Sequence, residues 1–179
     1  MRLFLGITFQ EEILQEVGQT IHRLKKNSIK GNFTRKKNLH LTLAFLGEID
    51  ERQIIKIEEI MNSIDMNPFV IELDILGKFR SRGGDIYWIG FKESAQLQRL
   101  YEELSRKLRK NGFLLEDRPY TPHLTLGRKV ILDEKIDIET LSKEIPNLQI
   151  EISEIHLIQS HRVDEVLTYT PIRTKLMQN

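Results

Sequence analysis

The sequence contains no cysteine, which excludes disulfide bonds and thiolate-ligated metal sites. It also lacks the His-Glu-x-x-His, EF-hand, Walker A and Gly-x-Gly-x-x-Gly patterns, so dedicated metal, nucleoside triphosphate and dinucleotide sites have no support. No apolar run is long enough to cross a membrane, and Met1–Leu5 is too short an apolar segment for a signal peptide. We therefore expect a soluble cytoplasmic protein that binds no cofactor and no metal.

Acidic residues are missing from Val17 to Gly47, although the formal net charge of the whole chain is only +1. The cations in this stretch are Arg23, Lys25, Lys26, Lys30, Arg35, Lys36 and Lys37. Such a stretch attracts polyanions. The alternative is a solvated helix end and loop, because Lys and Arg also favour helix C-termini.

The length of 179 residues, with 40% hydrophobic residues, fits one compact domain or two small lobes that share a cleft. Hydrophobic periodicity predicts strands and helices in two similar orders. The first order is a strand at 2–8, a helix at 10–26, a basic loop broken by Gly31, a strand at 38–46, a helix at 50–65 and a strand at 69–77. The second is a strand at 86–91, a helix at 94–111, a strand at 122–128, a weaker helix at 134–145, and strands at 148–159 and 165–172.

A repeated tetrapeptide is the most informative feature that is present. His40-Leu41-Thr42-Leu43 recurs 83 residues later as His123-Leu124-Thr125-Leu126. In a strand, His and Thr would share one face and the leucines the other. A single histidine in an apolar strand is usually a core residue, but the same shift also superimposes the first strand and helix of each half. We interpret the chain as a single bilobal domain, 1–179, with repeat halves of approximately 1–82 and 83–179.

The two motifs and their flanks carry a family resemblance. The segments 40–48 and 122–128, together with the opening 2–7, the Phe79-Arg80 turn and the strand 87–90, resemble the two-histidine phosphoesterases. More narrowly, they resemble the RNA 2′,3′-cyclic phosphodiesterases of bacteria and archaea, also called 2′-5′ RNA ligase-like proteins. This resemblance implies an α+β fold of two similar lobes, with antiparallel sheets flanking a central groove and helices outside. It also implies a metal-independent hydrolase that opens a terminal 2′,3′-cyclic phosphate to a 2′-phosphate.

The chemistry of such a reaction needs a base for the entering water and an acid for the departing ribose oxygen. Imidazole suits both tasks because its ordinary pKa of about 6.5 lies near neutral pH. By analogy with the family we assign His40 as general acid and His123 as general base, although the residues alone leave this order open. Thr42 and Thr125 are expected to donate hydroxyl hydrogens to the phosphate, and Arg128 to add a cation there.

Arg128 does not fit simple strand alternation. Counting from His123 places Arg128 on the opposite face, so it reaches the phosphate only if the strand bulges or ends at Gly127. The aligned position in the first half is Phe45. We therefore expect an asymmetric site.

Further candidates for RNA contact are weaker. They are Arg35, Lys36, Lys37, Arg80, Arg82 and Trp88. The arginines of the 80–85 turn could guide RNA or simply keep the turn soluble. Trp88 alternates with Tyr87, so one of the two could stack on a base while the other packs in the core. His22, His156 and His161 are interpreted as structural or surface residues.

Three functions remain open at this point. The leading one is RNA 2′,3′-cyclic phosphodiesterase, with RNA or a related nucleotide as the partner and neither a membrane nor an obligate protein partner implied. The second keeps the site but takes a small cyclic nucleotide or ADP-ribose cyclic phosphate. The third is an RNA- or nucleotide-binding protein without turnover, which would not require both imidazoles.

Overall fold

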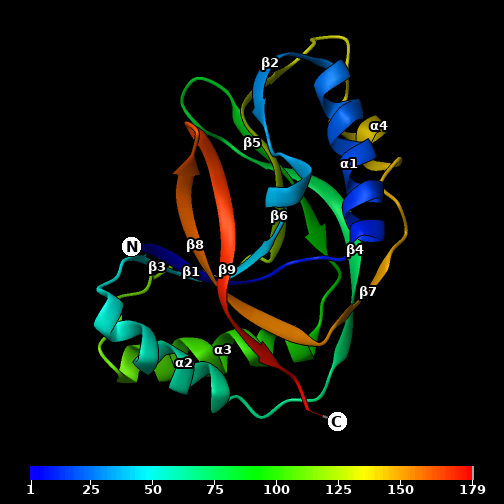
Figure 1. The fold of residues 1–179 in the computed structure, drawn as a ribbon. Helices are drawn as coiled ribbons and strands as arrows, with labels where there is room; N and C mark the ends of the chain where they lie inside the picture. Colours follow the sequence, from blue (N-terminus) through cyan, green and yellow to red (C-terminus); the bar gives the residue numbers. More distant parts are fainter. Residues whose placement is uncertain (179) are drawn as a thin grey trace.

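Strands and helices follow one another along the chain in an α+β arrangement, as expected (Figure 1). The structure is a computed structural model, and it describes residues 1–178. The strands are β1 (Arg2–Ile7), β2 (Ser28–Phe33), β3 (Leu41–Glu48), β4 (Phe69–Phe79), β5 (Asp85–Phe91), β6 (His123–Leu132), β7 (Gln149–Ile152), β8 (Glu154–Val163) and β9 (Val166–Leu176). The helices are α1 (Glu11–Lys26), α2 (Ile54–Asn62), α3 (Ala95–Lys110) and α4 (Ile138–Ser142), with short 3₁₀ turns at Lys36–Asn38 and Glu51–Gln53.

The strands form one antiparallel sheet that narrows to a single residue pair near its middle. Its order is β7-β4-β5-β6-β3-β1-β8-β9, and β2 pairs with β6 off this path. Within the described residues, β3 and β6 pair only at Leu41 and Leu124. We call β1, β3, β8 and β9 the β1 half-sheet, and β4, β5, β6, β7 and β2 the β5 half-sheet. The resemblance implied separate sheets, but the structure has one antiparallel sheet whose two parts are continuous through this pair.

The helices are divided between the two half-sheets. Helix α1 contacts β2 and β6, and α4 contacts β4, so both lie against the β5 half-sheet. Helices α2 and α3 pack on each other, and they contact β9 and β3 of the β1 half-sheet. Figure 1 shows α1 and α4 along one side of the molecule and α2 and α3 together at the bottom. None of these helices is long and apolar enough to cross a membrane in the part of the chain described here.

Helix α3 illustrates how the sequence builds the core. Its N-cap is Ser94, whose side chain accepts a hydrogen bond from the Leu97 backbone N–H at 3.2 Å. Leucines at 97, 100, 104 and 108, spaced three or four residues apart, are all at most 2% exposed. Each contributes to a shared core that reaches both half-sheets. Truncating Leu104 to alanine should therefore cost about 2–5 kcal/mol of unfolding free energy.

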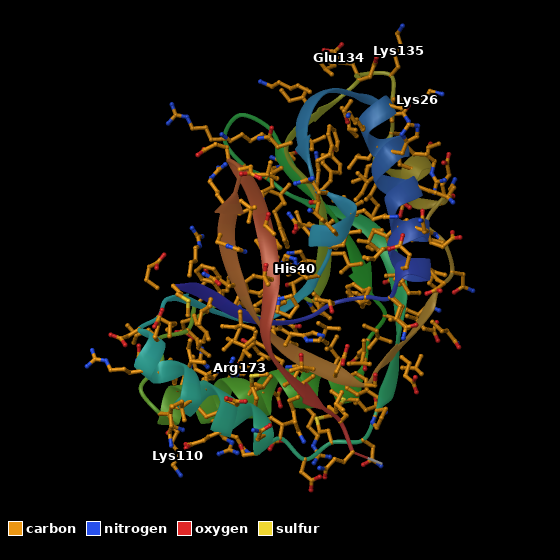
Figure 2. The ribbon with its side chains drawn as sticks, in the orientation of Figure 1. Lys26, His40, Lys110, Glu134, Lys135 and Arg173 are labelled. Atoms are coloured by element: carbon orange, nitrogen blue, oxygen red, sulfur yellow. The ribbon has the colours of Figure 1, made fainter. Side chains whose placement is uncertain are left out.

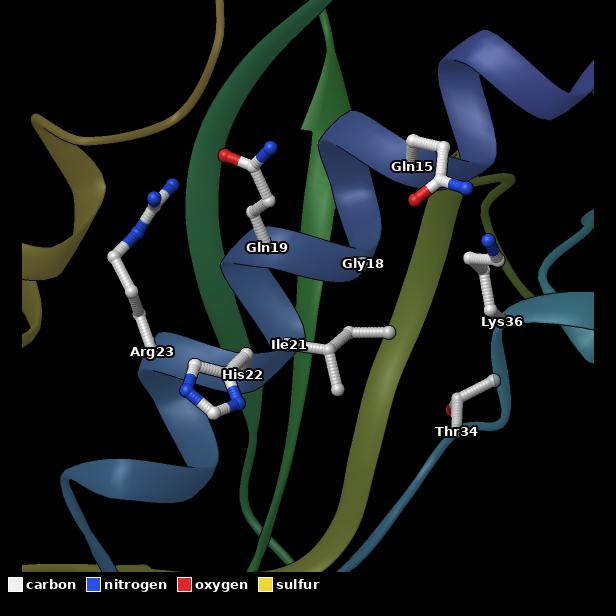
Figure 3. A pocket seen from close by; sticks show the side chains of 8 residues that line it. All are labelled: Gln15, Gly18, Gln19, Ile21, His22, Arg23, Thr34 and Lys36. Carbon is white, nitrogen blue, oxygen red and sulfur yellow. The ribbon is translucent and has the colours of Figure 1, made fainter.

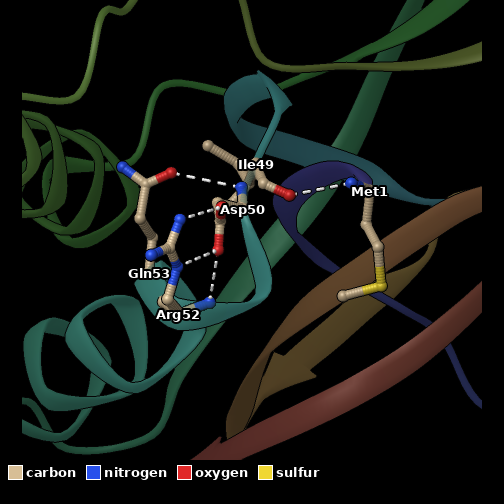
Figure 4. A network of polar contacts seen from close by, with 5 residues as sticks. All are labelled: Met1, Ile49, Asp50, Arg52 and Gln53. Carbon is tan, nitrogen blue, oxygen red and sulfur yellow. Dashed lines mark hydrogen bonds and ion pairs between the residues drawn. The ribbon is translucent and has the colours of Figure 1, made fainter.

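The corner between β3 and α2 is fixed by a small polar network (Figure 4). The terminal amine of Met1 donates to the Ile49 carbonyl at 2.7 Å. The Asp50 carboxylate accepts from the Arg52 backbone N–H at 2.9 Å, while Gln53 Oε1 accepts from the Asp50 N–H at 3.2 Å. This reciprocal capping box starts the helix that follows. It anchors the far end of the strand that begins beside His40.

The basic segment after the first helix was expected to be a loop, and this expectation is wrong. Residues 28–33 form β2, which pairs with β6. Gly31 is what permits the close packing, because a Cβ there would lie 2.9 Å from both the Phe33 ring and a Val130 methyl. Glycine and scattered charges hide the strand from sequence periodicity.

The expected single strand at 148–159 is also wrong. It is two strands, β7 and β8, separated at Ser153. Strand β7 pairs with β4, whereas β8 pairs with β1, so the chain crosses from the β5 half-sheet to the β1 half-sheet at this residue. The Ser153 carbonyl accepts from the Met177 N–H at 2.8 Å. The apolar alternation shifts by one residue at the break, from Ile150 and Ile152 to Ile155 and Leu157, and this local sign was overlooked.

Candidate active site

The two histidine motifs lie where the half-sheets meet. His40 directly precedes β3, and His123 is the first residue of β6. Each is followed by the leucine that forms the single pair between these strands, Leu41 with Leu124. The charge of His123 helps to lower the pKa of His40, so the two imidazoles interact electrostatically. Figure 2 shows His40 near the middle of the molecule, whereas Lys110 lies at its periphery.

Both imidazoles are held by the same backbone hydrogen bond. His40 Nδ1 lies 2.8 Å from the Asn38 carbonyl oxygen, and His123 Nδ1 lies 2.6 Å from the Thr121 carbonyl oxygen. A carbonyl oxygen can only accept, so Nδ1 carries the hydrogen in both rings. Nε2 is therefore the nitrogen that can take up or release a proton. Each ring is presented in the tautomer that general acid–base catalysis requires.

The environment lowers the pKa of both histidines below the ordinary value of 6.5. Burial is the largest cause for each ring, because it disfavours the charged imidazolium. The backbone hydrogen bonds oppose this effect, whereas the charge of Arg128 lowers the pKa of both rings further. Arg118 adds to the effect on His123. Without substrate, both rings thus favour the neutral form at neutral pH, and a bound phosphate anion would raise both pKa values.

On the β5 half-sheet, Thr125 and Trp88 share the face that bears His123. Thr125 lies opposite Trp88 in the antiparallel pair, and the Trp88 ring centroid is 5.9 Å from that of His123. The indole lies over Gly77, where a Cβ would come within 2.2 Å of the ring. Trp88 is half-buried, whereas Tyr87 is only 3% exposed. Of these two aromatics, Trp88 is therefore the one beside the histidine.

On the β1 half-sheet, His40 sits between two aromatic rings. The Phe4 ring centroid is 4.7 Å away, and the Tyr169 ring packs edge-on at 4.9 Å. Thr42 pairs with Gly6 on β1, two residues from Phe4, so its side chain lies on the same face. Each half-sheet thus offers one imidazole and one hydroxyl.

Three aromatic residues of the site were missed in the sequence. Phe4 alternates with buried leucines on β1, a pattern that could have marked it as facing the other side. Tyr169, from β9, and Phe79, from β4, reach the histidines only through strand pairing. The Phe79 ring centroid is 5.2 Å from that of His123. No local sequence signal could have revealed these contacts.

Strand β6 bulges on both sides of Gly127. Before it, β6 advances from Thr125 to Gly127 while β5 advances only from Trp88 to Tyr87, and this extra residue turns Arg128 to the face that bears His123. The pairing with β5 passes from Gly127 to Val130 while β5 advances only from Tyr87 to Asp85, and Lys129 has a φ of +52°. The sequence predicted that Arg128 could reach the phosphate only if the strand bulged or ended at Gly127. Arg128 is exposed, and its charge acts on both imidazoles. The irregular backbone thus sets the guanidinium near the histidines.

The opposite half-sheet has no arginine at the aligned position. Phe45 stands there, 38% exposed, and the guanidinium of Arg2 lies over its ring at 5.1 Å from the centroid. On this side the cation is therefore Arg2 of β1, which lies against the Phe45 ring of the neighbouring strand β3. The site is asymmetric, as the sequence predicted.

The basic residues before His40 are spread around a 3₁₀ turn. Lys36 pairs with Glu11 of α1 at 2.6 Å, and its aliphatic chain packs on Gly18. Arg35 and Lys37 are exposed. Figure 3 shows Lys36 beside α1, at the border of a shallow depression that is also lined by residues of α1. Within residues 1–178, Lys36 is the one of these three cations that pairs with a carboxylate.

The remaining predicted residues lie farther from the motifs in sequence. Arg80 and Arg82 are exposed on the turn between β4 and β5. His22 is exposed on α1, in agreement with its interpretation as a surface residue. His156 is 5% exposed and bonded to Thr174, and His161 is bonded to Thr170, so both have structural roles on the β8–β9 hairpin.

In residues 1–178, no three His, Asp or Glu side chains form a group that could hold a metal ion.

Comparison with known proteins gives a consistent result. Residues 11–164, which include both histidine motifs, match the family model of the 2′-5′ RNA ligase superfamily. The chain belongs to this superfamily. An RNA 2′,3′-cyclic phosphodiesterase of Methanocaldococcus jannaschii is 39% identical over 137 residues, covering 75% of each chain. One of Thermotoga maritima is 29% identical over 163 residues, covering 89% of this chain and 87% of the relative.

The superfamily membership extends to three-dimensional structure. The crystal structure of E. coli LigT complexed with 3′-AMP superimposes with a TM-score of 0.81, at 27% identity, covering 99% of this chain and 98% of the other. The resemblance seen in the sequence is therefore confirmed at the level of family and fold.

Proposed function

We propose that this chain is an RNA 2′,3′-cyclic phosphodiesterase, which hydrolyses a terminal 2′,3′-cyclic phosphate to a 2′-phosphomonoester. One observation carries the proposal. Two imidazoles from opposed half-sheets interact, and each has Nδ1 bound to a carbonyl and Nε2 available for proton transfer. The names of the relatives in the superfamily support the same activity.

In the proposed mechanism, His123 takes a proton from water as the water oxygen attacks phosphorus. The bond from phosphorus to the ribose 3′-oxygen breaks, and His40 gives its proton to that oxygen. The products are a 2′-phosphate and a free 3′-hydroxyl, with His123 protonated and His40 neutral. Thr42 and Thr125 donate hydroxyl hydrogens to the non-bridging oxygens, and Arg128 compensates their charge.

The order of acid and base follows the family resemblance alone, because the repulsion between the two charged rings is mutual and would serve either order. The charge of His123 lowers the pKa of His40. Protonation of His123 during attack would therefore make His40 a stronger acid at the moment when the leaving oxygen needs a proton. The bound phosphate anion would favour the protonated form of His40 before attack.

We also propose that the bilobal domain arose from a repeat of halves 1–82 and 83–179. Two features support it. The bridging residues Leu41 and Leu124 are 83 positions apart. Strand β1 pairs with β3 and β8, as β5 pairs with β6 and β4. Strands β4 and β8 are thus exchanged between the repeats, so each half-sheet is built from both halves of the sequence.

The substrate separates the leading function from its two alternatives. A short RNA ending in a 2′,3′-cyclic phosphate should be converted to a product heavier by one water and sensitive to phosphatase. Turnover of small cyclic nucleotides or ADP-ribose cyclic phosphate without turnover of RNA would favour the second function. Tight binding of RNA without turnover of either class would favour a binding protein. A cytoplasmic location and the absence of an obligate protein partner stay predictions from the sequence.

A further inference from the structure

Asn38, two residues before His40, is a polar residue that the fold buries. It is 5% exposed and ends the 3₁₀ turn at Lys36–Asn38, whereas the nearby Arg35 and Lys37 are exposed. A buried amide loses its hydrogen bonds to water, so it depends on hydrogen bonds within the protein. The groups that Asn38 binds therefore indicate its role.

Asn38 forms hydrogen bonds through both its backbone and its side chain. Its backbone carbonyl accepts from His40 Nδ1–H at 2.8 Å. Its side-chain Nδ2 donates to the carbonyl of Leu167 on β9, also at 2.8 Å. We call this second hydrogen bond the β9 anchor. One residue thus joins the imidazole to a strand residue that is 129 positions away from it in the sequence.

Stability alone does not explain an asparagine at this position. The other polar atom of its side chain, Oδ1, is buried and has no hydrogen-bond partner within residues 1–178. A buried acceptor without a partner costs at least as much free energy as one amide hydrogen bond gains. The β9 anchor is therefore better explained by what it holds in place than by its contribution to folding.

Strand β9 also contacts His40 directly. The ring of Tyr169, two residues beyond Leu167, packs edge-on against the imidazole with the centroids 4.9 Å apart. Packing against a ring limits where the imidazole can lie, whereas the hydrogen bond to the Asn38 carbonyl sets the direction in which its nitrogens point. That carbonyl can set the direction only if it is itself held. The β9 anchor holds it to the same strand that carries Tyr169.

The aligned position before His123 is built differently. Thr121 lies 83 residues after Asn38, and its carbonyl accepts from His123 Nδ1–H at 2.6 Å. The Thr121 side chain, however, is exposed. Both rings therefore share the hydrogen bond to the backbone, but only at His40 does a buried side chain of the bonded residue support it.

We propose that Asn38 is a positioning residue for His40, and that the β9 anchor holds the carbonyl that orients the imidazole. This inference rests on the proposed function. Asn38 acts through His40 rather than by touching the substrate. Proton transfer requires Nε2 within hydrogen-bond distance of the reacting oxygen, and a misplacement of about 1 Å can cost about 10²-fold in rate. Loss of the anchor should therefore lower kcat and leave substrate binding largely intact.

Asn38→Leu tests the anchor, because leucine has a similar size and branching but no donor. With a cyclic-phosphate RNA, kcat should fall about 10- to 100-fold while KM stays within about twofold. Thr20→Val, which removes a hydroxyl that is buried to a similar extent on α1, is the control and should leave both constants unchanged. A wild-type kcat in Asn38→Leu would overturn the proposal. Absence of turnover by the wild-type protein would instead refute the proposed function.

A double variant distinguishes positioning from a general loss of structure. In the His40→Ala background, Asn38→Leu should lower kcat no further, because no imidazole is left to position. A further loss of about tenfold there would overturn the proposal. Asn38→Ala, which only truncates the side chain, takes the place of Asn38→Leu if urea unfolding shows that the latter does not fold.

The imidazole itself gives a readout that needs no substrate. The ¹⁵N chemical shifts of His40 should report one tautomer, with the hydrogen on Nδ1, in the wild-type protein. They should report a mixture of both tautomers in Asn38→Leu. The same single tautomer in both proteins would contradict the proposal, whatever the change in kcat.

Discussion

The surroundings of His40 and His123 differ in all but a few features. Each imidazole donates Nδ1–H to the carbonyl two residues before it, and each has a threonine two residues after it. The aromatic neighbours differ: Phe4 and Tyr169 surround His40, whereas Phe79 and Trp88 surround His123. The shared features are those that proton transfer at phosphorus requires.

The differences concern the substrate. Arg128 stands on one side and Phe45, with Arg2 above it, on the other. Strand β2 occupies the space beside β6, while a cavity of about 330 Å³ lies beside β3. The two sides thus share the groups that the proposed chemistry needs and differ in what flanks them.

The largest effect is expected when one of the histidines, which the two sides share, is replaced. His40→Ala and His123→Ala should each lower kcat by about 10²- to 10⁴-fold, the usual contribution of a positioned acid or base. The double variant should lose little more than either single one, because the two residues act as a unit. Single-turnover kinetics with a cyclic-phosphate RNA would measure this. Near-normal activity of one variant would exclude that histidine from the mechanism.

The next largest effect is expected when Arg128, the main difference between the two sides, is replaced. Arg128→Ala should lower kcat/KM about 10- to 100-fold, because it removes a charge-assisted hydrogen bond to the phosphate. It should also raise the pKa of both histidines, because the Arg128 charge lowers them in the native protein. Phe45→Ala, at the aligned position, is the control and should leave the pH profile in place. Equal shifts of the pH profile in the two variants would show that the two sides are equivalent.

The pH dependence should reflect the lowered pKa values of both rings. The kcat/KM profile should be bell-shaped with its maximum below pH 6.5, since one ring must be protonated and the other neutral in the free enzyme. The unfolded chain binds protons to these histidines at higher pH than the native one, so stability should fall as the pH drops below 6.5. Urea unfolding at pH 7.5 and 5.5 would measure the difference. In His40→Ala the loss should be smaller, and an unchanged loss would contradict the role of burial.

The smallest effect concerns contacts between RNA and the exposed cations away from the histidines. Arg35→Glu with Lys37→Glu should weaken binding of a cyclic-phosphate oligonucleotide more than that of a mononucleotide. The salt slope should fall by about 0.7 for each phosphate that the variant no longer neutralises. Arg80→Glu with Arg82→Glu makes the same test on the β5 half-sheet. A salt series with both substrates would show which side the RNA follows. Equal effects on both substrates would identify these cations as a solvated surface.

Much of this arrangement could be predicted from local patterns. The helices at 11–26 and 95–110 follow from apolar residues spaced three and four apart, and the motif strands follow from alternation. The repeat of four residues was enough to propose the histidine and threonine pairs. Counting along β6 from His123 predicted that Arg128 reaches the site only if the strand is irregular, and β6 does bulge next to Gly127.

The rest depends on pairing between distant segments. Strand β2 was missed because Gly31 is required by the Phe33 and Val130 side chains against it, and these contacts form only in the folded sheet. The crossing at Ser153 depends on which half-sheet each side joins. The aromatic neighbours Tyr169 and Phe79 likewise arrive through long-range pairing. Local periodicity predicts elements, but it does not predict which of them become neighbours.

One measurement tests the central claim, that His40 and His123 serve opposite ends of the same displacement. In a 2′,3′-cyclic substrate with sulfur in place of the 3′-oxygen, the leaving group is a thiolate, which needs no proton because thiols have a pKa of about 8.5. His40→Ala should hydrolyse this substrate at close to the wild-type rate, whereas His123→Ala should stay impaired by about 10²-fold or more. Restoration of His123→Ala instead would reverse the two roles. Equal impairment of both variants would contradict the division of labour itself.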